Sequence, residues 1–191
     1  MSVNTVDATI DLTRSALVLI DLQNGIVGMP TAPLSGEEVV TNARRLADHF
    51  RDYGAPVVLL SLRFPEPVPG RVRPDVVLPL PESKPEGWEE LVPGLGQHPN
   101  DVRLTKRGWG AFLGTDLDVT LRACNVSTIV IGGIATNLGV ESTAREAMGL
   151  GYDVVVASDA VTSLSDAHHE FSIQHILPMV GRVRSTQEII G

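Results

Sequence analysis

The chain has 191 residues, of which 43% are hydrophobic and 20% charged, with a formal net charge of -8 at pH 7. This length suits a single domain over residues 1–191, and the hydrophobic content excludes a disordered chain. The acidic charge argues against nucleic acid and membrane as partners. The first 14 residues lack the apolar centre of a signal peptide, and Cys124 is the only cysteine, so we expect a cytoplasmic protein.

Six short apolar runs along the chain predict β-strands. They cover residues 16–20, 56–62, 102–105, 128–131, 154–157 and 181–183. Because these runs are apolar without alternation, they suit a parallel sheet that is buried on both faces. Helical segments separate most of them, which indicates right-handed βαβ units. The pattern therefore predicts an α/β protein with a doubly wound, Rossmann-like, six-stranded and mainly parallel sheet, covered by helices on both faces in three α/β/α layers.

Helix starts are marked by capping boxes, in which Ser or Thr is followed three residues later by an acidic residue. Three such boxes are Ser35 with Glu38, Thr115 with Asp118, and Ser185 with Glu188. The second helix should end near Cys124, which we expect to pack at the amino edge of the sheet. Further helices are expected after Gly139 and over residues 166–179.

Residues 63–101 interrupt the alternation of strands and helices. This segment holds nine of the 13 prolines and is much longer than a usual connection. Because it leaves the carboxyl end of a strand, we expect it to act as a lid over a site or as an oligomerisation arm.

Polar features follow three of the predicted strands. Asp21 follows the first and Lys106 the third, while the turn 134–139 follows the fourth. In a doubly wound sheet these ends share one edge, where ligands bind. Taken singly, Asp21 could be a turn residue, Lys106 a solvated charge and the turn a tight connection. Together they predict a small cavity surrounded by a carboxylate, an ammonium group and a helix start.

Gly139 occupies the place where an α/β enzyme of this kind would carry a nucleophile. One explanation for the glycine is close packing of the helix on the sheet. The other is that backbone amides must approach a ligand with no side chain between them. The five histidines show no spacing typical of metal ligands, and no phosphate-binding glycine motif is present, so we expect neither a metal nor a cofactor.

Four stretches of the sequence resemble the isochorismatase-like (cysteine hydrolase) superfamily. They are residues 17–24 (LVLIDLQN), 106–117 (KRGWGAFLGTDL), 132–147 (GGIATNLGVESTAREA) and 156–160 (VASDA). The amide-cleaving members of that family use a triad of Asp, Lys and Cys. Asp21 and Lys106 match the first two, and Gly139 stands at the position of the missing Cys. The resemblance is therefore to a cysteine-lacking subgroup, and it also implies a non-proline cis peptide at Ile134–Ala135.

Without a thiol, a covalent thioester route is closed. True isochorismatases also resemble this chain in having glycine there, and they cleave a vinyl ether by acid–base chemistry. The resemblance thus implies a hydrolase that acts on a small carboxylated molecule, at a vinyl ether or related C–O or C–N bond. Asp21 would be the acid, and Lys106 with the turn amides would orient the substrate. A nearby ammonium favours the carboxylate form, so burial must raise the pKa of Asp21 for this role. The alternative is a catalytically silent binding protein.

The remaining site residues are expected to bind the substrate. Trp109 and Phe112 should shape the pocket together with the proline-rich loop, and Gln23 and Asn137 should add hydrogen bonds. The turn should supply the anion site through Ile134, Ala135, Thr136, Asn137 and Leu138. The family resemblance further implies a homodimer or homotetramer.

Overall fold

The computed structural model describes residues 10–63, 74–76, 78, 83–96 and 98–191. It contains a six-stranded sheet in the order β3-β2-β1-β4-β5-β6, and every neighbouring pair is parallel. The strands are β1 (Ser15–Ile20), β2 (Val57–Leu62), β3 (Val102–Lys106), β4 (Thr128–Ile134), β5 (Asp153–Thr162) and β6 (Arg182–Arg184). The predicted six-stranded parallel sheet and α/β class are confirmed.

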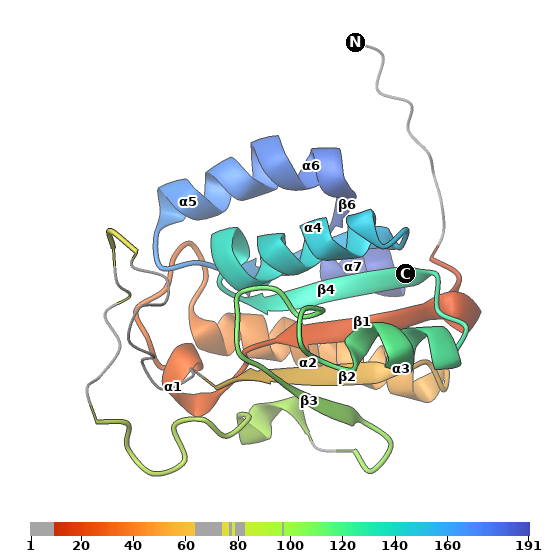
Figure 1. Ribbon diagram of the computed structural model, residues 1–191, viewed down its shortest axis with the longest axis horizontal. Helices are drawn as coiled ribbons and strands as arrows, with labels where there is room; N and C mark the ends of the chain where they lie inside the picture. The colour runs from red at the N-terminus through yellow and green to blue at the C-terminus, as the bar shows by residue number, and fades with distance from the viewer. Residues whose placement is uncertain (1–9, 64–73, 77, 79–82, 97) are drawn as a thin grey trace.

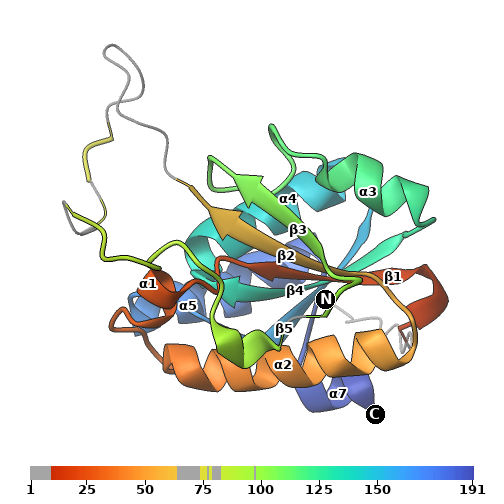
Figure 2. The ribbon, with the colours of Figure 1, turned by 90° about the horizontal axis from the view of Figure 1, so that it is seen from below.

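The helices lie on both faces of this sheet, as Figures 1 and 2 show. They are α1 (Asn24–Val27), α2 (Gly36–Asp52), α3 (Leu117–Ala123), α4 (Glu141–Gly149), α5 (Asp166–Phe171), α6 (Leu177–Val180) and α7 (Thr186–Ile190). Short 3-10 turns cover Leu12–Arg14 and Pro93–Leu95, and wider π turns cover Thr136–Val140 and Ser172–Ile176. In Figure 2, α2 and α7 lie below the sheet, with α3 and α4 above it.

The two faces of β1 explain why its sequence is apolar throughout. Leu17 and Leu19 pack in the core between the sheet and α2, whereas Ala16, Val18 and Ile20 pack in the core between the sheet and α3, α4 and α6. Every residue of β1 is buried. Successive side chains of a strand point to opposite faces, so a strand covered on both sides has no solvent-facing position.

Two of the three predicted capping boxes form. Ser35 and Glu38 cap α2, and Ser185 and Glu188 cap α7. The prediction for Thr115 and Asp118 was wrong, since α3 begins only at Leu117. The Thr115 hydroxyl donates to the Ala111 carbonyl at 2.6 Å, and Asp118 accepts from the Tyr152 hydroxyl at 2.7 Å. Thr115 is therefore used in local hydrogen bonds, which include one accepted from the Leu117 amide, and Asp118 in a tertiary contact with Tyr152.

Two other expectations need correction. Cys124 follows α3 beside Pro56 and Val102, at the amino edge of the sheet, but it is exposed and is not a packing residue. The helix predicted over residues 166–179 is present but interrupted by the π turn. Because Pro178 has no backbone N–H, it cannot continue the regular hydrogen bonds of an α-helix.

Much of the proline-rich segment 63–101 lies outside the described residues. The described part near Trp88 packs against the residues that follow β1. The amides of Asn24 and Gly25 donate to the carbonyls of Glu90 and Trp88 at 2.8 and 3.0 Å, and Trp88 is buried. This part of the segment is thus attached to the carboxyl edge of the sheet.

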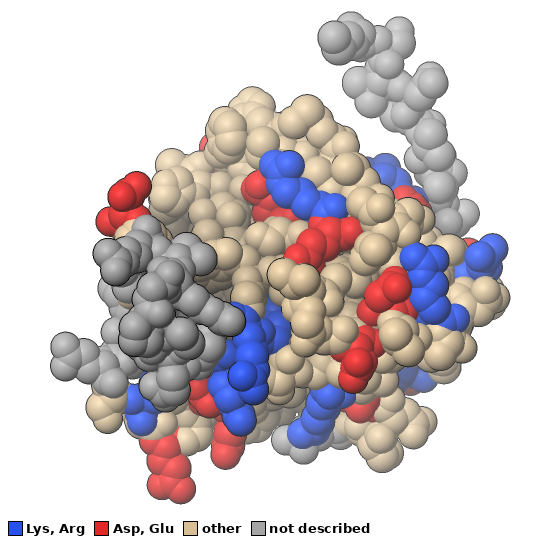
Figure 3. Space-filling view, viewed as in Figure 1, with Lys and Arg blue, Asp and Glu red and all other residues tan. Residues whose placement is uncertain are grey.

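The surface carries charges of both signs. Figure 3 shows Lys and Arg side chains interspersed with Asp and Glu on the viewed face. Within the described ranges, no helix combines the length and the apolar character needed to cross a bilayer.

Candidate active site

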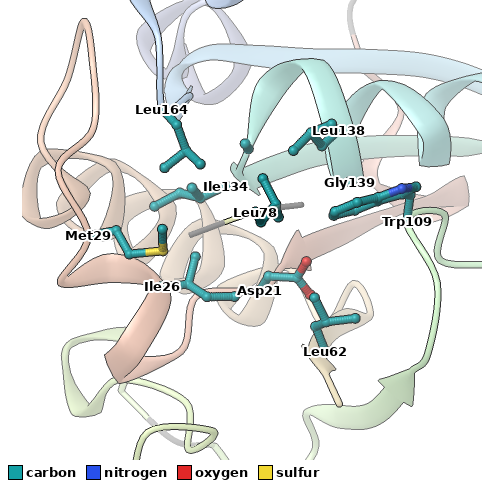
Figure 4. Close-up of a pocket in the computed structure, with 11 residues that line it drawn as sticks. Asp21, Ile26, Met29, Leu62, Leu78, Trp109, Ile134, Leu138, Gly139 and Leu164 are labelled. Atoms are coloured by element: carbon teal, nitrogen blue, oxygen red, sulfur yellow. The ribbon is translucent and has the colours of Figure 1, made fainter. Parts of the chain in front are cut away.

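The site lies where the direction of the strand order changes. β1 pairs with β2 on one side and with β4 on the other. Asp21 directly follows β1, and the turn 135–140 directly follows β4. A gap between the connections opens at such a point because they leave in opposite directions. The cavity of Figure 4 lies here, with Asp21 and Gly139 among its lining residues.

The backbone at Asp21 turns sharply out of β1. Its φ is 56°, in the left-handed region that aspartate tolerates better than most residues. Its backbone N–H still donates to the Leu60 carbonyl at 2.9 Å, while its backbone carbonyl accepts from the backbone N–H of Gln23 at 2.8 Å. The turn therefore ends the strand and directs the Asp21 side chain to the cavity, where the residue is only 3% exposed.

Lys106 reaches Asp21 from two strands away. It is the last residue of β3, and β2 lies between β3 and β1. Its Nζ lies 2.8 Å from Oδ2 of Asp21 and donates to the carbonyls of Gly108 and Trp109, each at 3.0 Å. Because an ammonium group has three N–H donors, these contacts use all of them. Lys106 is fully buried and does not line the cavity, so the substrate-orienting role expected for it is not supported by this geometry.

The two oxygens of Asp21 differ in their surroundings. Oδ2 faces Lys106, whereas Oδ1 is buried and has no hydrogen-bond partner in the described part of the chain. Burial raises the pKa of Asp21 to about 6, although the charge and hydrogen bond of Lys106 act in the opposite direction. Desolvation therefore outweighs the ion pair, as an acid role requires.

Among the described residues, the lining of the cavity is apolar apart from Asp21. Its enclosed space is small, about 40 Å³, and reaches about 420 Å³ only when the open mouth is included. The buried floor contains Ile26, Leu62, Ile134, Ala135 and Gly139, and the more exposed rim contains Met29, Leu78, Trp109, Leu138 and Leu164. Leu78 comes from the proline-rich segment, which is the contribution expected of that loop.

The turn after β4 is held in place by hydrogen bonds of its own side chains. Its Ile134–Ala135 peptide is cis, as the resemblance implied. Thr136 is fully buried and its hydroxyl lies 2.9 Å from Nδ1 of His169, while Asn137 accepts a hydrogen bond from the Ser163 hydroxyl at 2.5 Å. The side chains of Thr136 and Asn137 are thus used to fix the turn, and neither lines the cavity. The backbone amides of Leu138 and Val140 donate to the Ala135 carbonyl at 3.1 and 3.2 Å, so the start of the turn is partly closed by its own hydrogen bonds.

Gly139 faces Asp21 across a narrow space. A Cβ atom placed there would lie 3.3 Å from Oδ2 of Asp21, 3.1 Å from Cγ2 of Ile20 and 3.5 Å from the Trp109 carbonyl. A side chain at this position would therefore start beside the carboxyl group. The spacing favours both earlier explanations of the glycine, because the helix packs closely here and the cavity floor stays open.

Two predicted site residues lie elsewhere. Gln23 is fully buried. Its side-chain amide donates to the backbone carbonyls of Leu62 and Glu89 and accepts from the backbone N–H of Leu62. It joins β2 to the proline-rich segment and has no free group for a substrate. Phe112 packs against Tyr152 in the core on the α4 face, with ring centroids 5.7 Å apart, and does not line the cavity.

Several contributing residues were missed from the sequence. Ile26, Met29, Leu62 and Leu164 line the cavity, but apolar residues at these positions look like ordinary core. Glu146 was missed as well: it accepts a hydrogen bond from the Phe112 amide at 2.8 Å and so holds the loop that carries Trp109. The described residues contain no group of three or more His, Cys, Asp or Glu side chains able to hold a metal ion.

A three-layer α/β protein with a buried acid at the switch point of its sheet is the class that this geometry defines. The isochorismatase domain model matches residues 15–188. The chain is 44% identical to the uncharacterized isochorismatase family protein YecD of Escherichia coli O157:H7, over 93% of this chain and 95% of that protein. It therefore belongs to the isochorismatase family.

Solved structures agree with this assignment. An isochorismatase family protein from Burkholderia thailandensis is 44% identical, has a TM-score of 0.82, and matches 93% of this chain and 94% of its own. N-carbamoylsarcosine amidase from Thermoplasma acidophilum is 26% identical with a TM-score of 0.76, over 93% of this chain and 99% of its own. The family fold is thus shared with an enzyme that is named for amide cleavage.

Proposed function

We propose that this protein is a hydrolase that cleaves a small carboxylated molecule by acid–base chemistry, without a covalent intermediate. The observation that carries the proposal is the state of Asp21, which lines the cavity and whose buried Oδ1 lacks a protein partner among the described residues. A carboxyl group in that position with a pKa near 6 can hold a proton at mildly acidic pH and release it to a bound molecule.

A vinyl ether is the bond that suits this chemistry best. Oδ1 of protonated Asp21 would donate its proton to the terminal carbon of the double bond, whose π electrons form the new C–H bond. The resulting oxocarbenium ion adds water, and the Asp21 carboxylate takes the proton that the water loses. The hemiketal then breaks into a ketone and an alcohol, so that one water is consumed for each ether cleaved.

The remaining groups have supporting roles in this proposal. Because every donor of Lys106 is engaged, the substrate carboxylate would meet the backbone of the turn after β4, where Ala135, Leu138 and Gly139 line the cavity. Lys106 would hold Oδ2 of Asp21 and leave Oδ1 to carry the proton. Trp109 would cover the cavity mouth, and its carbonyl oxygen lies close to Gly139.

The lack of a nucleophile at Gly139 favours a second candidate, a protein that binds a small molecule and does not turn it over. A comparison of wild type with Asp21→Asn separates the two. We expect the wild type to hydrolyse a carboxylated vinyl ether and the variant to bind it without turnover, because asparagine keeps the shape but has no transferable proton. Binding without turnover by both proteins would support the second candidate. Efficient amide hydrolysis by the wild type would contradict the acid–base mechanism.

A further inference from the structure

The polar side chains around the cavity are turned away from it. The Gln23 amide is bonded to Leu62 and Glu89, the Thr136 hydroxyl to His169, and Asn137 to Ser163. At the end of β5, the Thr162 hydroxyl donates to the Leu34 carbonyl at 2.8 Å. These four polar side chains at this edge of the sheet therefore have protein partners and do not line the cavity.

Apolar side chains form most of the described lining of the cavity. In the view of Figure 4, Ile26, Met29 and Leu164 lie on one side of Asp21, with Trp109 on the other. No lysine or arginine is among the described residues of the lining, and Asp21 is its one charged side chain. A second charge or a set of hydroxyl groups on a ligand would lose water here without gaining a partner.

We propose that the site takes a substrate with a hydrocarbon body, an aryl or alicyclic ring without hydroxyl groups, and with no more than one charge. This inference rests on the proposed function for the position of the scissile bond, but it concerns the part of the substrate that faces the apolar wall. The single carboxylate meets the backbone of the turn after β4, the cleaved bond meets Asp21, and the ring packs against Ile26, Met29 and Leu164.

Leu164 is suited to test whether the apolar side chains Ile26, Met29 and Leu164 select the ligand. It lies in the connection between β5 and α5, is half-buried and lines the rim of the cavity. A lysine there can keep its stem in the same place while its ammonium group reaches the mouth. Leu113 is a matched control, because it is 82% exposed and does not line this cavity.

The experiment measures the binding of unreactive ring compounds by titration calorimetry. The probes are cyclohexanecarboxylate, cyclohexane-1,4-dicarboxylate and the polyhydroxylated quinate. We expect wild type to bind the first, and to bind the other two about 100-fold more weakly or worse, since their extra polar groups are buried without partners. Leu164→Lys should bring the dicarboxylate to within about tenfold of the monocarboxylate, whereas Leu113→Lys should behave as wild type.

Tighter or equal binding of the dicarboxylate or quinate by wild type would overturn the inference, and so would failure of all three compounds to bind. Because these compounds carry no cleavable bond, the result is separate from that of the hydrolysis test. Hydrocarbon binding without turnover of any vinyl ether would leave this inference standing and remove the proposed function. Turnover with a preference for polyhydroxylated rings would do the reverse.

Discussion

Oδ2 of Asp21 lies 2.8 Å from Nζ of Lys106, while Oδ1 of the same carboxyl group has no partner among the described residues. One oxygen is therefore fixed by a buried positive charge, and the other is buried without a hydrogen bond from the described residues. The ammonium group is itself held by two carbonyls of the loop that carries Trp109. The acid and the cover of its cavity are thus organised by one lysine.

The rate of hydrolysis should fall as the pH rises above about 6. Because burial raises the pKa of Asp21 to about 6, the protonated form that can donate is lost above that pH. We expect kcat/KM to decrease about tenfold for each further pH unit. A pH profile from 4.5 to 8 with a carboxylated vinyl ether measures this, and a rate that stays constant up to pH 8 would rule out Asp21 as the acid.

The stability of the fold should depend on the same proton. The folded-state pKa of Asp21 is raised from 3.8 to about 6, so the unfolded chain releases this proton more readily. The free energy of unfolding therefore decreases relative to Asp21→Asn as the pH rises from about 4 to 6, by at most about 3 kcal/mol. Urea unfolding of both proteins at pH 4, 5, 6 and 7 tests the sign. Parallel pH dependences would show that the pKa is not raised.

Replacing Lys106 with methionine should destabilise the protein strongly at pH 7. It leaves the buried Asp21 carboxylate and two loop carbonyls without their partner, a loss of about 3–5 kcal/mol. Arg145→Met provides the control, since Arg145 pairs with Glu141 at the surface and is half-exposed, where a pair is worth about 1 kcal/mol or less. Urea unfolding at pH 7 gives both values. Similar values for the two variants would contradict the buried role of Lys106.

Gly139→Cys should place a thiol beside Asp21. The Cβ contacts of 3.1 Å with Ile20 and 3.3 Å with Asp21 require only small shifts of these two side chains, so we expect the variant to fold. In a Cys124→Ser background, which removes the exposed native thiol, the new thiol should react with a disulfide reagent and allow cleavage of a simple amide. Gly139→Ala separates the effect of the thiol from that of added bulk. Equal amide cleavage by the Ala and Cys variants would refute the prediction.

Gln23→Leu should lower stability and leave ligand affinity unchanged in the protein that remains folded. The variant removes the three hydrogen bonds between the Gln23 amide, Leu62 and Glu89, which should cost about 1–3 kcal/mol. Urea unfolding and calorimetric titration with cyclohexanecarboxylate measure the two quantities. Tenfold weaker binding with full stability would assign Gln23 to the substrate instead.

The fold could be predicted because β1, β2 and β4 are apolar along most of their length, and because the capping boxes at Ser35 and Ser185 mark the starts of α2 and α7. The edge location of Asp21, Lys106 and the turn followed from the parallel sheet alone. The capping box at Thr115 failed because Thr115 donates to the Ala111 carbonyl and Asp118 is bonded to Tyr152, a distant partner that is not visible in a local pattern.

Within the site, the sequence could not show where the side chains point. Gln23 and Asn137 have the chemistry of substrate ligands but serve the backbone and Ser163, and Lys106 has three internal acceptors. Conversely, Met29 and Leu164 are indistinguishable from core residues until the cavity is seen. The polar residues in the sequence indicated which positions lie at the carboxyl edge of the sheet. Whether each polar side chain bonds to the protein or to a ligand depended on packing between segments far apart in the chain.

The place of Asp21 in the lining of the cavity has a stereochemical consequence. In the proposed hydrolysis, a double bond bound in the cavity receives the proton only on the face that is turned to Asp21. In deuterated water, the new C–D bond of a suitably labelled product should therefore have a single configuration. An unbound vinyl ether in acid would give both configurations in equal amounts.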